Sequence, residues 1–82
     1  MSTPNSETDL RAGIAALKAG NRTQARDLLL QVVDKDDTNE MAWLWLSGAV
    51  DSLEDRQICL ENVLTINPDN AAARRGLAKL TG

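Results

Sequence analysis

Residues 60–77 read LENVLTINPDNAAARRGL, and residues 29–46 read LLQVVDKDDTNEMAWLWL. A shift of 31 residues places one segment on the other, so that large apolar side chains, a polar turn and a new helix start coincide. The coinciding residues include Leu29 with Leu60, Val32 with Val63, Asn39 with Asn70, and Leu46 with Leu77. The same helix end, turn and helix start therefore occur twice, which indicates a repeat architecture.

Outside these segments the chain has helical periodicity and no strand pattern. Apolar residues recur at intervals of three and four, as in Leu10, Ile14 and Leu17, and no run alternates apolar and polar residues with a period of two. The pattern predicts an all-α fold of antiparallel helix-turn-helix repeats. The five predicted helices span residues 6–19, 22–35, 39–51, 53–66 and 70–80.

Capping residues mark the boundaries between these helices. Gly20 is suited to the left-handed conformation that ends a helix. Asn21 and Gln24 have the pattern of an N-cap in which the glutamine side chain reaches back to the backbone N–H of Asn21. Ser52, followed by acidic residues, is typical of a helix start. Asn67 precedes a proline and is therefore disfavoured in a helix.

At these positions the chain resembles the tetratricopeptide repeat (TPR) family, which repeats a helix pair every 34 residues. Residues 6–39 match one full unit at Gly13, Gly20, Asn21, Ala25 and Leu29. Residues 40–70 match a second unit at Trp43, Leu46, Ser47, Val50, Leu60, Val63, Leu64 and Pro68. The resemblance implies that residues 71–82 form a polar capping helix, and residues 1–5 are expected to be a disordered N-terminus.

The second unit departs from the family pattern in length. The second unit is 31 residues long, three fewer than the family's 34, and the three missing residues correspond to the glycine-containing turn. Asp51 and Ser52 are therefore expected to make a tight corner. Asp9 and Asp37 also stand where the family usually has tryptophan and proline.

Composition excludes several classes of function. The chain has 82 residues, a net charge of −3, one cysteine, two tryptophans and no histidine. Zinc, haem and Cys–His sites therefore cannot be assembled within it, and a net acidic chain lacks the charge of a nucleic-acid binder. No stretch is apolar for long enough to cross a membrane. We predict a protein that is not an enzyme, requires no cofactor or metal, and resides in the cytoplasm.

Three other features carry a chemical and a structural interpretation. Asp51-Ser52-Leu53 resembles the attachment site of acyl carrier proteins, in which the serine carries phosphopantetheine, but Ser52 also serves as an N-cap, which we favour. Cys59 lies among apolar residues and is expected to be an inert core thiol. The acidic cluster at residues 34–37 lacks the glycine and the bidentate glutamate of a calcium loop and is expected to be solvated.

The TPR resemblance implies that the first helix of each pair lines a concave groove. The groove residues expected from it are Leu10, Ile14, Leu17, Met41, Leu44, Trp45, Gly48 and Asp51. An apolar groove favours an amphipathic helix or an extended apolar segment of another protein as ligand. The same residues could instead form the core or a homodimer interface. Trp45 is interpreted either as a partner anchor or as a contact with the last helix. We expect the chain to be part of a longer protein.

Overall fold

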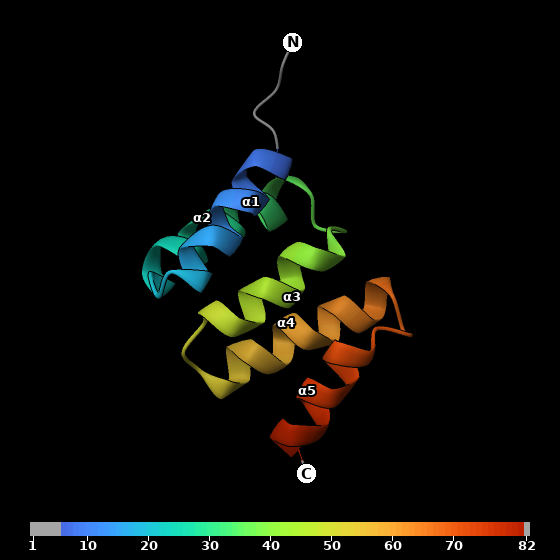
Figure 1. Cartoon of the computed structure of the whole chain (residues 1–82). Helices are drawn as coiled ribbons and strands as arrows, with labels where there is room; N and C mark the ends of the chain where they lie inside the picture. Colours follow the sequence, from blue (N-terminus) through green and yellow to red (C-terminus); the bar gives the residue numbers. More distant parts are fainter. Residues whose placement is uncertain (1–5, 82) are drawn as a thin grey trace.

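In a computed structural model of the chain, residues 6–81 are described, and they form five α-helices, each turning back against the one before it (Figure 1). The helices are α1 (Ser6–Lys18), α2 (Arg22–Lys35), α3 (Glu40–Ala49), α4 (Leu53–Ile66) and α5 (Ala71–Thr81). No strand occurs within this part of the chain. The predicted all-α architecture is therefore confirmed, and the helix ends differ from the predicted ones by no more than two residues. The expected disorder of residues 1–5 lies outside the described residues.

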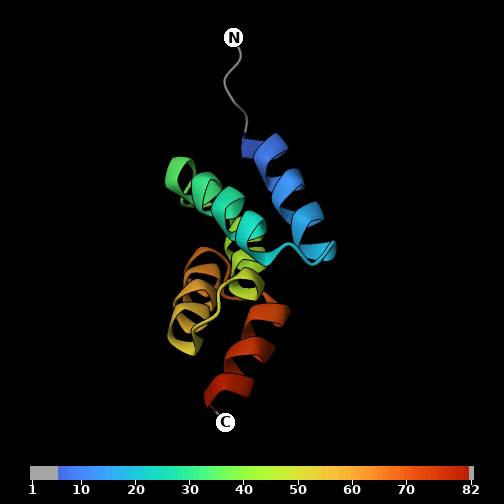
Figure 2. The same ribbon diagram turned by 90° about the vertical axis from the view of Figure 1, so that its left-hand side faces the viewer.

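The helices form an elongated array with extents of 44 × 26 × 17 Å. Each helix packs on its neighbour in sequence, and α1 also contacts α3. Figure 2 shows α2 and α4 on one side of the molecule, α1 and α5 on the other, and α3 between them. None of the helices formed by residues 6–81 is both long and apolar enough to span a bilayer.

Two clusters of buried side chains hold the array together. The first core cluster consists of Ala16, Ala25, Leu29, Val32, Val33, Ala42, Leu46, Ala49, Val50 and Cys59. The second core cluster is smaller and consists of Leu60, Val63 and Ala73. Small residues allow the helices to approach closely: a Cβ atom placed on Gly13 would lie 2.8 Å from Leu29 Cγ. Helices α1 and α2 therefore approach each other closely at Gly13.

The repeat seen in the sequence is also a repeat of the backbone. Asp36 after α2 has φ −141° and ψ 82°, and Asn67 after α4 has φ −140° and ψ 94°. Asn39 and Asn70 occupy the N-cap positions that follow, and their side chains accept hydrogen bonds from Ala42 N (3.0 Å) and Ala73 N (2.9 Å). The two turns thus have the same length, conformation and capping side chain.

The two connections within the helix pairs differ from each other. Gly20 ends α1 with φ +90°, as predicted, whereas the α3–α4 connection has an extended Val50 and the Ser52 cap. Asn21 occupies the N-cap position of α2, but its side chain makes no capping hydrogen bond, so the predicted side-chain cap is wrong. Both connections contain three residues, whereas α1 has 13 residues and α3 has 10. The missing three residues therefore shorten α3 and not the corner.

Candidate functional site

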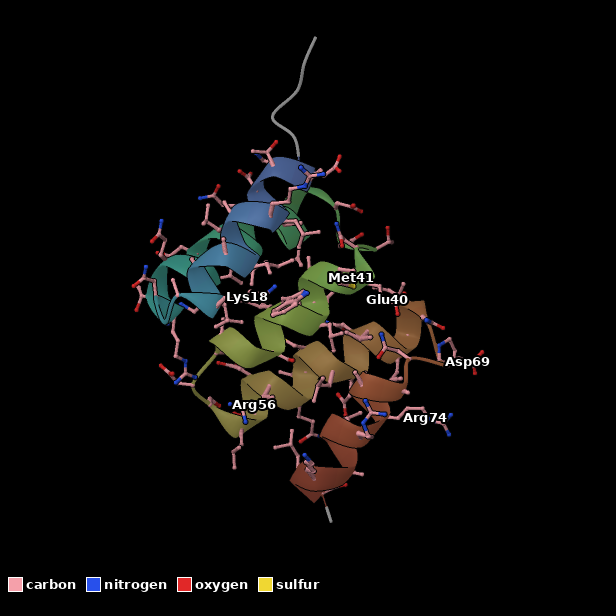
Figure 3. The ribbon with its side chains drawn as sticks, in the orientation of Figure 1. Lys18, Glu40, Met41, Arg56, Asp69 and Arg74 are labelled. Atoms are coloured by element: carbon pink, nitrogen blue, oxygen red, sulfur yellow. The ribbon has the colours of Figure 1, made fainter. Side chains whose placement is uncertain are left out.

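The predicted binding residues gather on one side of α1 and α3. Met41, Trp45 and Gly48 lie four and three residues apart and so share a face of α3. Leu17 Cδ2 would lie 3.5 Å from a Cβ atom placed on Gly48, and Lys18 Nζ lies 5.7 Å from the centroid of the Trp45 ring. Figure 3 shows Lys18 reaching from α1 toward α3, on the same side as Met41. We refer to this surface as the α1–α3 face; its residues are Ile14, Leu17, Lys18, Met41, Leu44, Trp45 and Gly48.

Most side chains of the α1–α3 face are half-buried. Met41 is 47% exposed, and Gly48 is also exposed, whereas Ile14, Leu17, Leu44 and Trp45 are intermediate. Leu10, Leu17 and Trp45 pack against the first core cluster, and Leu44 packs against the second. The residues predicted to line a groove therefore also support the core. The interpretation of these side chains as core is supported for Leu10, Leu17, Leu44 and Trp45, and their interpretation as a binding surface stays a prediction.

The two tryptophans have different surroundings. Trp43 Nε1 donates a hydrogen bond to the Asp37 carbonyl oxygen at 2.8 Å, which ties α3 to the turn before it. Trp45 Nε1 is buried and has no hydrogen-bond partner among residues 6–81. The ring of Trp45 lies against the first core cluster and under the Lys18 ammonium group, not against the cluster that contains α5. The contact between Trp45 and the last helix and the role of Trp45 as a partner anchor both stay predictions.

Asp51 does not join the α1–α3 face, because it is engaged at the end of α3. Its carboxylate lies 3.2 Å from Arg22 Nη2, which also donates to the Val50 carbonyl oxygen at 3.1 Å. Arg56 Nε donates to the Ser47 carbonyl oxygen at 3.1 Å. The last carbonyl groups of a helix have no partner within it and carry partial negative charge, so the two arginines stabilise the early end of α3.

A second polar contact that sequence reasoning missed joins α3 to the last turn. Glu40 Oε2 accepts hydrogen bonds from Asn67 Nδ2 (2.8 Å) and Asn70 Nδ2 (2.6 Å). In Figure 3, Glu40 points toward the turn that contains Asp69. The bonds from Asn67 and Asn70, in that order, hold the pKa of Glu40 below its ordinary value. Glu40 therefore fixes the α4–α5 turn against the start of α3. The 31-residue repeat places Asn70 on Asn39 and Asn67 on Asp36, and nothing in it indicates a carboxylate partner.

Ser52 and Cys59 have the structural surroundings that were expected. Ser52 Oγ accepts hydrogen bonds from Glu54 N (3.1 Å) and Asp55 N (3.3 Å), so its predicted role as an N-cap is confirmed. Cys59 is 4% exposed. Burial, with a smaller contribution from the carboxylate of Asp55, raises the pKa of the Cys59 thiol to about 11. The thiol is therefore protonated near neutral pH and has little thiolate character.

Two surface depressions lie away from the predicted binding residues. The larger one, about 660 Å³, surrounds the α1–α2 connection and is lined by Gly20, Asn21, Arg22, Thr23, Gln24, Asp27 and Leu28. A smaller one, about 260 Å³, is lined by Asp37, Thr38, Trp43, Asn62, Thr65 and Ile66. In the described part of the chain, no three Cys, Asp or Glu side chains gather closely enough to hold a metal ion.

No protein-family model matches the sequence, and a search of curated proteins finds no relative.

The α1–α3 face contains six of the eight predicted site residues, together with Lys18, which the sequence did not single out. Its chemistry is that of an apolar contact surface bordered by one ammonium group.

Proposed function

We propose that the chain is a TPR-like helical-repeat module that binds a segment of another protein on its α1–α3 face, and that it has no enzymatic activity. The observation that carries the proposal is the exposed Met41 beside the half-buried Trp45 and Leu17. Met adapts to different partners, and Trp is enriched at the centre of interfaces. The repeated turn supports the TPR-like part of the proposal. The same proposal includes a cytoplasmic location.

Binding on this face relies on apolar burial. Met41 and its neighbours project from helices whose other faces belong to the first core cluster, so the surface is held in place before a partner arrives. Preformed surfaces lose less conformational entropy on binding. An amphipathic helix, with anchors three and four residues apart, matches the spacing of Met41, Trp45 and Gly48 along α3.

A random library of displayed 16-residue peptides tests the proposal. Peptides enriched on the protein are synthesised, and their affinity is measured by calorimetry for the natural chain, for Met41→Glu and for Ile58→Glu. Ile58 is a matched control, because it is 49% exposed and belongs to α4, which contributes no residue to the α1–α3 face. We expect Met41→Glu to weaken binding at least tenfold and Ile58→Glu to leave it unchanged. Failure to enrich any peptide, or equal loss in both variants, contradicts the proposal.

Two other functions are distinguished by separate measurements. If the α1–α3 face joins two copies of the chain, sedimentation will show a dimer that Met41→Glu converts to a monomer. If Ser52 carries phosphopantetheine, incubation with coenzyme A and a broad-specificity phosphopantetheinyl transferase will add the mass of that group, and Ser52→Ala will prevent it. We expect a monomer and an unchanged mass.

A further inference from the structure

The charges around the α1–α3 face are not those of the whole chain. The chain has a net charge of −3. Near this face, however, the acidic groups are engaged: Glu7 pairs with Arg11 at 3.2 Å, Asp51 with Arg22 at 3.2 Å, and Glu40 accepts two amide hydrogen bonds. Lys18 is paired with no carboxylate in the described part of the chain, and its ammonium group lies 5.7 Å from the centroid of the Trp45 ring. One edge of the face therefore carries an uncompensated positive charge.

Helix α5, which lies on the same side of the molecule as α1, is also positively charged. Helix α5 contains three basic residues and no acidic one, and all three are exposed. In the 31-residue register, Arg75 occupies the position of Leu44, and Lys79 occupies the position of Gly48. Both positions in α3 belong to the α1–α3 face. Figure 2 shows α1 and α5 on the same side of the molecule, flanking α3.

We infer that the partner segment is an amphipathic helix whose apolar stripe is flanked on both sides by Asp or Glu residues. This inference rests on the proposed function of the α1–α3 face and specifies its ligand. The apolar stripe covers Met41 and Trp45, one acidic flank approaches Lys18, and the other approaches Arg75 and Lys79. A net acidic protein thus selects an acidic partner, because Glu7 and Asp51 near this face are paired with arginines and Glu40 is held by Asn67 and Asn70, whereas Lys18, Arg75 and Lys79 form no ion pair in the described part of the chain.

Charge complementarity of this kind acts mainly on selectivity and on the rate of association. The pairs would form at the solvent-exposed rim, so salt should weaken them, whereas apolar contacts at Met41 should persist. A partner with basic flanks would place like charges next to Lys18, Arg75 and Lys79, and its binding should be weaker.

Two synthetic 16-residue helical peptides test the inference. They share one leucine stripe with three- and four-residue spacing and differ only in having Glu or Lys on both flanks. Affinities are measured by fluorescence anisotropy, at low and at high salt, for the natural chain, for the double variant Lys18→Glu, Lys79→Glu, and for the control Lys35→Glu. Lys35 is also exposed and lies at the end of α2, outside the α1–α3 face.

We expect the acidic peptide to bind the natural chain at least tenfold more tightly than the basic peptide at low salt. The preference should reverse in the double variant and persist in Lys35→Glu. Equal binding of the two peptides overturns the inference and leaves the proposed function standing, whereas binding of neither peptide, together with failed library selection, overturns both. Vesicles with phosphatidylserine serve as a further arm, and vesicle binding that is lost in the double variant overturns the inference in favour of a lipid surface.

Discussion

The turn after α2 and the turn after α4 share one backbone conformation, but the helices that follow them have different roles. Helix α3 carries Trp43 and Trp45 and is covered by neighbours on both sides. Helix α5 has Arg74 and Gly76 at the equivalent positions, and it packs mainly on α4 through the second core cluster. The cap and the turn therefore determine where a helix starts. The side chains on its outer face determine whether another helix covers it or whether it ends the array.

The largest expected effect comes from truncating the equivalent leucines of the two junctions. Leu29 is 0% exposed in the larger first core cluster, and Leu60 is 3% exposed in the second. We expect Leu29→Ala to lower the free energy of unfolding by about 4 kcal/mol and Leu60→Ala by about 3 kcal/mol. Urea unfolding followed by circular dichroism measures both. A larger loss for Leu60→Ala would contradict the ranking of the two clusters; if Leu29→Ala does not fold, the two Leu→Val variants make the same comparison.

The second comparison concerns Gly13 and Gly76, the glycines that contact these two leucines. A Cβ atom on Gly13 would lie 2.8 Å from Leu29 Cγ, whereas on Gly76 it would lie 2.9 Å from Leu60 Cδ1. Cδ1 is the end of a flexible side chain, and Cγ moves only if the whole buried side chain moves. Alanine also gains about 1 kcal/mol over glycine in a helix. We therefore expect Gly13→Ala to destabilise by about 1–2 kcal/mol and Gly76→Ala to change stability by less than about 0.5 kcal/mol. Thermal unfolding tests this, and equal changes would show that the α4–α5 contact is as tight as the α1–α2 contact.

The two connections within the helix pairs allow a third comparison, of caps. Ser52 makes two capping hydrogen bonds and Asn21 makes none. We expect Ser52→Ala to lower the free energy of unfolding by about 1 kcal/mol and Asn21→Ala by no more than about 0.3 kcal/mol. The midpoint of urea unfolding is the measurement. A larger loss for Asn21→Ala would mean that its side chain caps α2 after all.

The smallest expected effect is a change in how stability depends on pH. It concerns the turn after α4, which Glu40 binds, and not the equivalent turn after α2. The pKa of Glu40 is lower in the folded protein than in the unfolded chain. Its contribution to the free energy of unfolding is therefore fully present above the unfolded pKa of 4.5 and is lost as the pH falls through the folded pKa. We expect Glu40→Gln to lower the melting temperature at neutral pH and to reduce its decrease between neutral and strongly acidic pH. Glu61→Gln is the control, because the carboxylate of Glu61 accepts its hydrogen bond from Gln57 of the same helix and forms no hydrogen bond with a turn in the described part of the chain. An identical pH dependence in the natural chain and in Glu40→Gln would contradict this role.

Much of the fold could be predicted from the sequence because it depends on local interactions. Helix starts at Ser52, Asn39 and Asn70 require only a side-chain oxygen and the next few amide groups. The helix end before Pro68 requires only the steric restriction on the preceding residue. The all-α class and the repeat therefore followed from residues close together in the chain, whereas the side-chain cap at Asn21 did not form even though its pattern was present.

The candidate site was predicted less completely, because its contacts join residues that are distant in sequence. Leu17 meets Gly48, and Lys18 meets the Trp45 ring, across α1 and α3. Asp51 was expected on the same surface, but the early end of α3 leaves it beside Arg22 instead. The sequence predicted that the second unit lacks three residues, but it did not indicate that α3, and not the α3–α4 connection, would be shortened.

Local sequence accounts for the helical fold, for where the helices begin and for the turn that occurs twice, because backbone hydrogen bonding and capping act over a few residues. The packing of the helices decides where α3 ends, that Asp51 pairs with Arg22, and that Lys18 lies beside the Trp45 ring. Ion pairing depends on distances between helices, and those distances are set by how closely glycine, alanine and leucine allow the helices to pack.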